Sequence, residues 1–559
     1  MLRLASLFTV LLVAAPIVGG LVFTALPAID IMPSIGRTQP SFAGWAALLH
    51  SPGFSTSLRL TVVSGVSATL LSFGLALAFC AQTLSRRGWG WLRLLQAPIL
   101  ASPHSAVALG LAFLIAPSGW IVRLLSPWAT GWTIPPGDLV TLRDPWGLTL
   151  VLGLTFKETP YLVLMIVVAS AQVPAPSLLA AAGALGQRPA TAWLKVVFPS
   201  IYRQIRLPIF AVLAFSLSVV DVALILAPGN PPPLAVLAVR WLTNYDLTLY
   251  VPAAAAAALV MLVVLAAIAL WWMVERPVAW LARAWIERGG ATPMIDAIVG
   301  AGAGIAVACG GTAYAGGAGV ALWSVARAWW FPDALPSAFS LDTWAAQAHH
   351  AYAAAATTVA VGGVVVGAAL VLALACLEHL QAQAGRLRRR AQGLVFAPLL
   401  VPQVAFLYGV QIVLVRLNLD GTVLAVAWTH LVFVLPYVVL SLSDPFLALD
   451  PRNAAAAAAL GAGRTRVFFT VKLPLLVRPI LVAAAVGFGV SLAQYLPTLF
   501  AGAGRVATVT TEAVTLSSGG DRRVIGVFAL LQAALPLLAY ALAFVIPAVL
   551  FRRRRGMAT

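Results

Sequence analysis

The sequence predicts an all-α, polytopic membrane protein with about 12 transmembrane helices in two parallel six-helix repeats. The observations are its composition, its apolar runs and an internal duplication. Of the 559 residues, 61% are hydrophobic and only 9% are charged, and the mean hydropathy is +0.97. A soluble protein carries about 25% charged residues, so this composition excludes a large soluble enzyme. The apolar residues extend from end to end, which also excludes a soluble body with one membrane anchor.

Twelve stretches of the sequence meet the requirement of about 20 mostly apolar residues for a spanning helix. The first six lie near 4–27, 57–81, 95–116, 147–170, 207–227 and 250–273. The second six lie near 294–325, 353–378, 393–416, 422–442, 478–500 and 524–551. The first run follows Arg3 and is interpreted as an uncleaved span, because it is long and no clear cleavage site precedes a soluble domain.

Basic residues predict the orientation of these spans. With the N-terminus placed in the cytoplasm, 24 of the 35 lysines and arginines fall in cytoplasmic segments. Because cytoplasmic loops are enriched in these residues, we expect both termini to be cytoplasmic. The net charge of +18 is then explained without nucleic acid. The C-terminal run Arg552–Arg555 is interpreted as a clamp on membrane lipid headgroups.

The chain contains an internal duplication. Segment 180–199 reads AAAGALGQRPATAWLKVVFP, and segment 455–474 reads AAAAALGAGRTRVFFTVKLP. Both have the frame A-A-A-x-A-L-G, then nine residues, then Val-x-(Phe/Leu)-Pro. Shorter elements recur upstream, namely Pro160-Tyr161 as Pro436-Tyr437, and Pro103 with Gly110 as Pro402 with Gly409. The chain therefore divides into repeats 1–280 and 281–559, each with six spans and one copy of the loop, 177–199 and 452–474. Loops on the same side in both halves predict a parallel repeat.

Each repeated loop predicts a helix, a glycine turn and a second helix. The Ala-rich part favours helix, and Gly186 or Gly461 permits a left-handed turn that ends it. A short basic amphipathic stretch follows, and Pro199 or Pro474 is expected to stop it. Such a rigid knob at the membrane surface suits a groove on a soluble partner. The alternative is a pair of interfacial connecting helices without a partner.

The loops resemble the EAA loop of permease subunits in binding-protein-dependent ABC importers, E-A-A-x-x-x-G-x(9)-I-x-L-P. The residues that match it are Gly186, Val196, Phe198 and Pro199 in one copy, and Gly461, Val471, Leu473 and Pro474 in the other. Both copies depart from the motif at its acidic position, where Ala180 and Ala455 stand. Two copies in one chain resemble the fused permeases of the iron(III), thiamine and polyamine branch, and stretch 491–532 is similar to YnjC-type permeases.

The resemblance also implies the partner proteins, the location and the class of substrate of the transporter. We expect two copies of an ABC ATPase subunit to dock on the two loops, a periplasmic substrate-binding protein on the other side, and a location in a bacterial inner membrane. The chain itself is expected to need no cofactor, since ATP and Mg would be bound by the partner ATPase. Thiamine, iron or a polyamine are the substrates that the resemblance suggests, and the residues do not select among them.

The sequence contains no ATP-binding P-loop, so it is not expected to be an enzyme. A P-loop needs Gly-Lys-Ser/Thr to grip the phosphates. The chain has three lysines, Lys157, Lys195 and Lys472, and none of them follows a glycine. If ATP drives transport, a separate subunit must hydrolyse it. The alternative is a proton-coupled secondary transporter that uses Glu158 and Asp221.

Five polar residues within the expected spans are candidates for the translocation path, because polar groups at bilayer depth are costly and usually face a cavity or a partner. They are Lys157, Glu158, Asp221, His430 and Gln494. The alternative for the charged residues is a structural ion pair between helices, for instance Lys157 with Asp221. His430 is more often a satisfied histidine of a helix bundle than a ligand.

No metal site is expected. The pair His349-His350 lies outside the membrane without a third ligand in reach. The three cysteines, Cys80, Cys309 and Cys376, lie in apolar runs without CxxC spacing, which argues against a zinc site or a disulfide framework.

Overall fold

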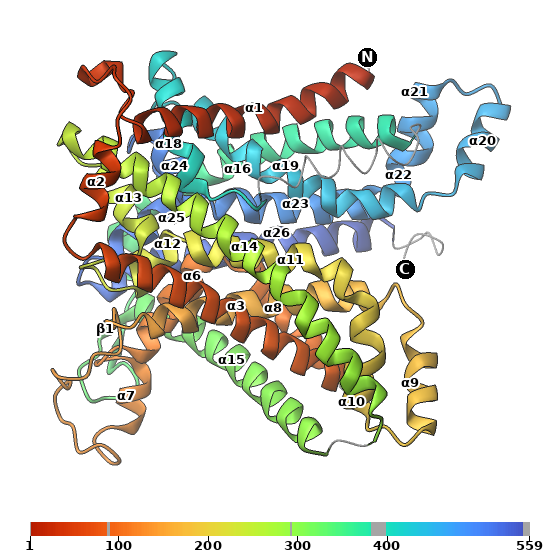
Figure 1. Cartoon of the computed structure of the whole chain (residues 1–559), viewed down its shortest axis with the longest axis horizontal. Helices are drawn as coiled ribbons and strands as arrows, with labels where there is room; N and C mark the ends of the chain where they lie inside the picture. Colours follow the sequence, from red (N-terminus) through yellow and green to blue (C-terminus); the bar gives the residue numbers. More distant parts are fainter. Residues whose placement is uncertain (1, 87–89, 291–292, 382–398, 552–559) are drawn as a thin grey trace.

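The computed structural model describes residues 2–86, 90–290, 293–381 and 399–551, which fold almost entirely into helices (Figure 1). The helices of the first half are α1 (Leu2–Ala28), α2 (Ala43–Leu49), α3 (Phe54–Ser85), α4 (Trp91–Leu94), α5 (Gln96–Ala101), α6 (His104–Ile115), α7 (Trp120–Leu125), α8 (Leu148–Ser170), α9 (Ala175–Ala184), α10 (Pro189–Ala192), α11 (Phe198–Ser218), α12 (Asp221–Leu226), α13 (Leu234–Leu242) and α14 (Tyr250–Glu287). The elements of the second half are α15 (Pro293–Val325), β1 (Ala326–Ala328), β2 (Ala338–Phe339), α16 (Asp342–Gln381), α18 (Gln403–Arg416), α19 (Val423–Leu447), α20 (Pro451–Ala459), α21 (Arg464–Val467), α22 (Leu473–Leu475), α23 (Val477–Leu492), α24 (Tyr495–Gly502), α25 (Val509–Leu516) and α26 (Arg522–Leu550). Strands β1 and β2 form one antiparallel pair.

The membrane-spanning elements confirm the predicted fold class. Ten helices among the described residues are long and apolar enough to cross a membrane, and the pair Arg464–Leu475 and Val477–Leu492, bent by 73°, adds an eleventh. One of the twelve expected spans is not matched by a full-length helix: in the ninth expected run, the described helix α18 has only 14 residues. The expected run 393–416 begins in residues that the structure does not describe. The chain is therefore an all-α membrane protein, and its described residues contain ten or eleven helices long enough to span the membrane.

Several helices extend beyond the apolar runs that predicted them. α14 continues from the expected end at 273 to Glu287, and α16 begins at Asp342, before the expected start at 353. Hydropathy marks the apolar part of a helix, whereas polar turns can continue the same helix outside the membrane. The expected boundary between the halves, after residue 280, consequently falls inside α14.

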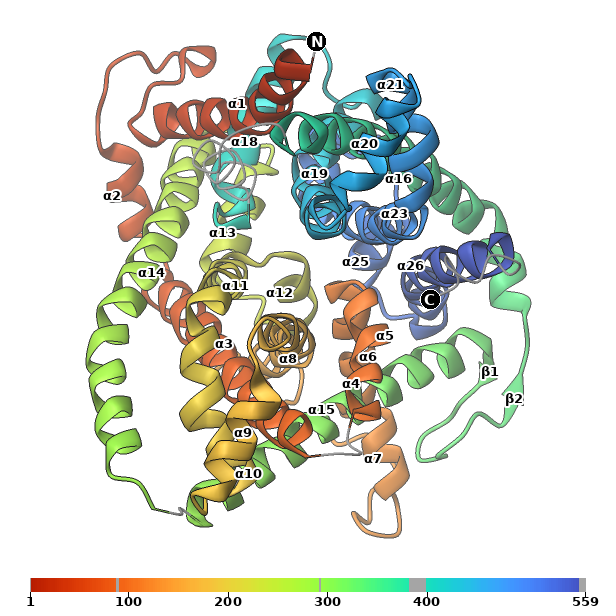
Figure 2. The same ribbon diagram turned by 90° about the vertical axis from the view of Figure 1, so that its right-hand side faces the viewer.

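The first span of each half packs against the third span of the other half. α1 lies against α18, and α15 lies against α6 (Figure 2). Both crossings are made by glycines. A Cβ on Gly409 would collide with the carbonyl of Gly20, and one on Gly316 would lie 2.8 Å from the carbonyl carbon of Gly110. Small residues of this kind let helix backbones approach closely in membranes, so two related glycine contacts join the halves.

The third and fifth spans are interrupted where the two halves meet. In the third span, Ser102-Pro103 separates α5 from α6, because proline disfavours helix for the residue before it. In the fifth span, the extended residue Val219 separates α11 from α12. Its counterpart in the second half is the break before Gln494, between α23 and α24. Interrupted helices at membrane depth are tolerated where they line a cavity or are buried in protein.

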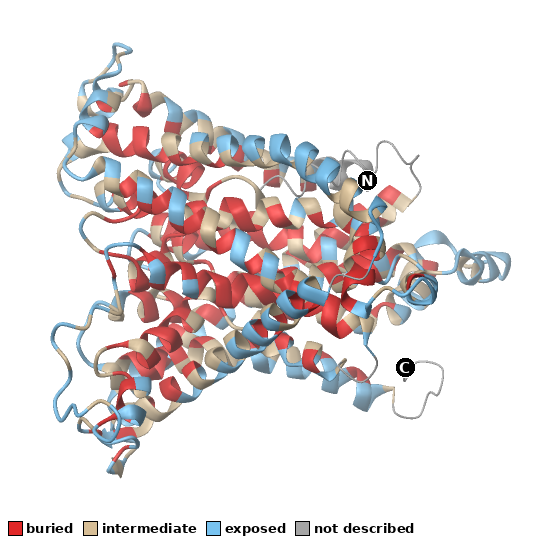
Figure 3. Cartoon of the chain, turned by 60° about the horizontal axis from the view of Figure 1, so that its bottom comes forward, coloured by how far each residue is buried: buried red, intermediate tan, exposed pale blue. Residues whose placement is uncertain are grey.

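Both repeated loops project from one end of the bundle. α9 and α20 lie at the end where α1 begins and α26 finishes, while α2, α7 and the strand pair lie at the opposite end (Figure 1). The buried residues lie between the helices, and the outer helix faces are exposed (Figure 3). On α14 this exposed face includes Leu262, Leu265 and Leu270, as expected of a surface that faces lipid.

Candidate functional site

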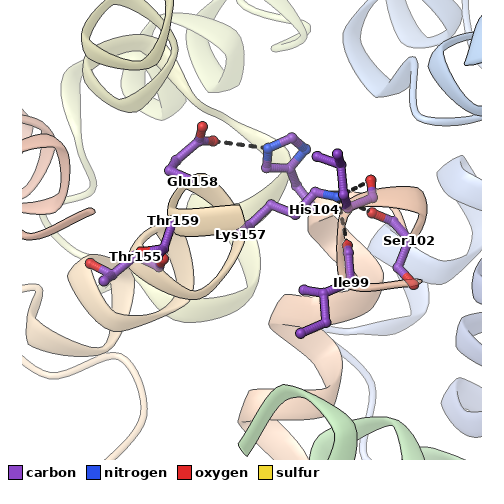
Figure 4. A network of polar contacts seen from close by, with 8 residues as sticks. Ile99, Ser102, His104, Thr155, Lys157, Glu158 and Thr159 are labelled. Carbon is purple, nitrogen blue, oxygen red and sulfur yellow. Dashed lines mark hydrogen bonds and ion pairs between the residues drawn. The ribbon is translucent and has the colours of Figure 1, made fainter. Parts of the chain in front are cut away.

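Lys157, in the middle of α8, caps the broken third span. Its Nζ donates hydrogen bonds to the carbonyl oxygens of Ile99 at 2.8 Å, Leu100 at 2.6 Å and Ser102 at 2.5 Å (Figure 4). These carbonyls lie at the C-terminal end of α5, where helix carbonyls lack partners and attract a cation. Because these carbonyls use all three ammonium protons, the ion pair with Asp221 considered above is wrong.

Glu158 contacts the other side of the same break. Its Oε1 lies 2.9 Å from Nε2 of His104, the first residue of α6 (Figure 4). The Glu158 side chain is 6% exposed, whereas that of His104 is 27% exposed and packs against Phe215 with ring centres 4.5 Å apart. The adjacent charges of α8 therefore hold the two ends of the break. His104 was missed by the sequence interpretation, although it directly follows Pro103, which recurs in the duplication.

Asp221 lies near the same histidine. It is the first residue of α12 and is only partly buried. His104 lies within electrostatic range of it, and so does Tyr495 of the second half. The break in the fifth span thus brings a second carboxylate to the break in the third, with a side chain of the other half beside it.

The tyrosines of the recurring Pro-Tyr pairs lie near this place. Tyr161 and Tyr437 lie within electrostatic range of each other, and both lie within range of Glu158. Together with His104 and Asp221, these three residues form what we call the polar centre. It lies between the fourth spans of the two halves, and it unites two of the five candidate path residues, Glu158 and Asp221.

The second half builds a neutral counterpart. Gln403 opens α18 as His104 opens α6, and its Nε2 lies 3.4 Å from Oε1 of Gln494 at the α23–α24 break. His430 of α19 contacts Ser491 at 3.0 Å and Thr498 at 2.9 Å, one on each side of that break. Since both ring nitrogens have partners, the geometry favours the structural role for His430.

The two repeated loops have the expected glycine turns. Gly186 and Gly461 have φ values of 76° and 80°. After α9, the N–H of Gln187 bonds to the carbonyl of Ala182 and that of Gly186 to Gly183, the pattern of a Schellman cap. Ala462 and Gly461 make the same two bonds after α20. The predicted helix–glycine–helix arrangement is confirmed in both copies.

The expected stop at the loop prolines is wrong for the first loop, whereas the helix of the second loop ends at Leu475, directly after Pro474, and the chain then bends by 73° into α23. Pro199 is the second residue of α11, which follows directly from a π-helical turn, Trp193–Val197. Pro474 lies in α22 after an equivalent π-helical turn, Phe468–Lys472. In an α-helix the proline ring clashes with the carbonyl of the preceding turn, and the wider π turn relieves this clash. The first loop is therefore helically continuous with the fifth span.

The first loop is fixed by the start of the second half. Oδ1 of Asp296, in α15, accepts hydrogen bonds from the backbone N–H of Thr191 at 3.0 Å and its Oγ1 at 2.8 Å. Lys195 donates to the carbonyl of Gly289 at 3.2 Å and lies 4.9 Å from the ring centre of Trp285. Asp296 is buried, so this anchor is shielded from water.

The second loop has a different acidic anchor. Nζ of Lys472 lies 2.6 Å from Oε2 of Glu378 in α16, and Nε of Arg464 lies 4.0 Å from Oε1 of the same residue. A groove of about 410 Å³ separates α16 from α20 here. Although Ala180 and Ala455 leave the loops without their own acidic residue, another helix supplies one to each loop.

The other matched loop residues divide by exposure. Val196, Phe198, Val471 and Leu473 are partly buried, and the tips before the glycines are the most exposed parts. The equivalent residues Leu185 and Leu460 are 83% and 90% exposed. Among the described residues, no group of three or more His, Cys, Asp or Glu could hold a metal ion.

Comparison with known proteins identifies the family. No family model matches the chain. The chain is 32% identical over 545 residues to the inner membrane ABC transporter permease protein YnjC of Escherichia coli strain K12, covering 97% of this chain and 96% of that protein. Similarity along almost the whole of both chains means that this chain belongs to the family of inner membrane ABC transporter permeases.

Proposed function

We propose that this permease is the fused transmembrane subunit of an ATP-driven importer, and that its two EAA-like loops bind two copies of a separate ATPase subunit. The observation that carries the proposal is the pair of exposed leucines, Leu185 and Leu460. Each immediately precedes the left-handed glycine of its loop, and both loops project from the same end of the bundle. Large apolar side chains at the tips of paired, rigid loops are suited to fill pockets on a protein partner.

The loops are well placed to transmit a movement of the ATPase to the polar centre. The helical path from the first loop runs through the π turn into α11 and ends at the break beside Asp221. The second loop leads through a 73° bend into α23, which ends at Leu492, two residues before Gln494. Closure of two ATPase copies would then tilt both fifth spans and open the polar centre to alternate sides. The ATPase must bind the two states unequally for this to occur.

The resemblance of the loops to those of importers supports inward transport. In this proposal a periplasmic substrate-binding protein docks at the end that carries α2, α7 and the strand pair, and the cytoplasm lies at the loop end. ATP and Mg belong to the ATPase, and the permease contributes the path and the docking loops. Glu158, Asp221 and the rest of the polar centre line the path, whereas Lys157 and His430 hold the breaks in shape.

The docking proposal is tested by substituting both tip leucines. The Leu185→Asp, Leu460→Asp variant should insert normally and lose at least about tenfold in ATPase affinity, because two apolar anchors become charged. Leu341→Asp, at an exposed leucine of the opposite end, is the matched control. Undiminished co-purification of the ATPase with the double variant would refute docking through the loop tips.

The cluster of His104, Glu158 and Asp221 favours one alternative, a proton-coupled secondary transporter. A histidine between two carboxylates is an arrangement that can pass protons along a path, and His104 lies near both Glu158 and Asp221. That mechanism predicts uptake that collapses with an uncoupler while ATP remains high. The ATP-driven mechanism predicts uptake that follows ATP and survives the uncoupler.

A further inference from the structure

A pocket of about 290 Å³ opens between the two halves at the end of the bundle opposite the repeated loops. The first half contributes Arg143, and Arg240 of α13. The second half contributes Tyr495 of α24, and the hydroxyl residues Thr515 and Ser518. The volume is that of a small-molecule site and is far too small for a protein domain.

The two arginines give the pocket an uncompensated positive charge. No acidic residue lines it, and neither arginine has a carboxylate within 4.0 Å in the part of the chain that the structure describes. Within the described ranges, the guanidinium of Arg240 donates to one group, the carbonyl of Gly229, at 2.5 Å. Asp144, which follows Arg143, uses its carboxylate to accept three backbone N–H groups at the start of α8. Most guanidinium donors therefore remain available for an anion.

Comparison of the two halves shows that the arginines line only the pocket wall that the first half supplies. α13 and α25 are equivalent, since each begins with a backbone N–H bonded to a threonine, Leu234 to Thr61 at 2.8 Å and Val509 to Thr358 at 3.0 Å. With the spacing of 275 residues that relates the loops, Arg240 corresponds to Thr515. The pocket thus has a basic wall from one half and a hydroxyl wall from the other.

We propose that this pocket is an external vestibule that receives the anionic group, a phosphate or carboxylate, of the transported substrate. This rests on the proposed transport function. Tyr495, which lines the pocket, also lies within electrostatic range of Asp221, so the pocket adjoins the polar centre. Arg143 is held at a φ of 55°, an unusual conformation for a residue other than glycine that recurs at ligand clamps.

A lipid phosphate is the other source of the same chemistry. α12 and α25, which form pocket walls, lie near the centre of the bundle when it is viewed from the loop end (Figure 2). The outer face of α14 and its exposed leucines form the perimeter instead. A central position favours a solute from the external solution, and the experiment below separates the two sources.

The charge of the pocket is measured with a Ser518→Cys variant and two thiol reagents that differ only in charge. In detergent at low ionic strength, the anionic methanethiosulfonate should react at least about tenfold faster than the cationic one, because a basic cleft concentrates anions. The parent protein gives the background from its own cysteines. Adding inorganic phosphate should slow the reaction, as it competes for the arginines.

Substitutions assign the effect to the arginines. Arg143→Gln with Arg240→Gln, on the Ser518→Cys background, should abolish both the preference for the anionic reagent and the protection by phosphate. Arg505→Gln, which removes an arginine already paired with Asp420 at 3.7 Å, should change neither. Equal rates for the two reagents, absent protection by phosphate, or a preference that survives loss of both arginines would overturn the proposal.

A measurement in lipid nanodiscs distinguishes a lipid phosphate from a substrate anion, and the absence of the ATPase from all measurements makes them independent of the docking proposal. If lipid phosphates occupy the pocket, transfer from detergent to lipid nanodiscs should block the Ser518→Cys thiol without added phosphate, and that result would also overturn the substrate assignment. All measurements use the permease without its ATPase. Thiol rates that contradict the anion site would therefore leave the docking proposal intact. Loss of support for ATPase docking would likewise leave these thiol rates unchanged.

Discussion

At the scale of single residues, Lys157 and Glu158 show what charge within a span can mean. Neighbouring side chains on a helix point about 100° apart, so the two residues reach different partners. Lys157 reaches the carbonyls that end α5, and Glu158 reaches the histidine that opens α6. Hydropathy identified both residues as costly, but their partners lie about 55 residues away at a break that hydropathy does not register.

Replacement of Lys157 by methionine should destabilise the protein. The variant keeps an unbranched side chain only one atom shorter and leaves three carbonyls without donors, at a cost of about 1–3 kcal/mol for each buried group that stays unpaired. We expect a clear fall in the Tm of the detergent-solubilised protein. Glu158→Gln, which retains a hydrogen-bond acceptor for His104, should change Tm much less. Equal Tm values for wild type and Lys157→Met would contradict the capping role.

At the scale of elements, the repeated loops were the most predictable part of the molecule. Their Ala-rich helices and glycine turns follow from local propensity and from the need for a positive φ. The expected stop failed at Pro199, because a π-helical turn that composition does not predict carries the helix on into α11, whereas the helix of the second loop ends at Leu475, directly after Pro474. The acidic anchors come from other helices, so no local pattern indicates them.

The glycine turns of the two loops should be required for tight binding of the ATPase. Gly186→Ala and Gly461→Ala place a side chain at a left-handed φ, which costs about 1–2 kcal/mol at each position. We expect both variants to insert normally and to bind the ATPase more weakly, as measured by co-purification. Gly183→Ala is the matched control, since Gly183 is helical and its side of α9 is open. A control that weakens binding as much as Gly186→Ala would argue against the turn.

The acidic anchors should each hold one loop. Asp296→Asn removes the charged acceptor of Thr191, and Glu378→Gln removes the partner of Lys472. Hydrogen exchange should quicken in 185–197 for the first variant and in 460–472 for the second, because charge-assisted bonds are the stronger ones. If either substitution loosened both loops equally, the anchors would not be separate.

The apolar runs did not predict that the fifth span of each half is interrupted. The runs 207–227 and 478–500 are mostly apolar, and a window of about 20 residues averages over the breaks at Val219 and Gln494. The polar residues Asp221 and Gln494 mark these breaks in the sequence, and a helix that begins with a carboxylate, as α12 does, is favoured by the helix dipole.

At the scale of the whole molecule, the exchange of first spans ties the two repeats into one unit. Long apolar runs predicted α1 and α15, but they do not say which helix each contacts. Gly20→Val should disrupt the crossing with α18, because its new side chain would meet the backbone of Phe406. Gly19→Val, where space is open, should not. Limited trypsin digestion should cleave the Gly20→Val variant faster, and equal rates would refute the crossing.

The central claim is that one chain carries two docking sites for an ATPase. Native mass spectrometry of the complex measures this most directly. We expect one permease with two ATPase subunits in the wild type, one ATPase when either Leu185→Asp or Leu460→Asp is introduced, and none with both. A wild-type complex without ATPase, or a stoichiometry of two that survives the double substitution, would contradict the account.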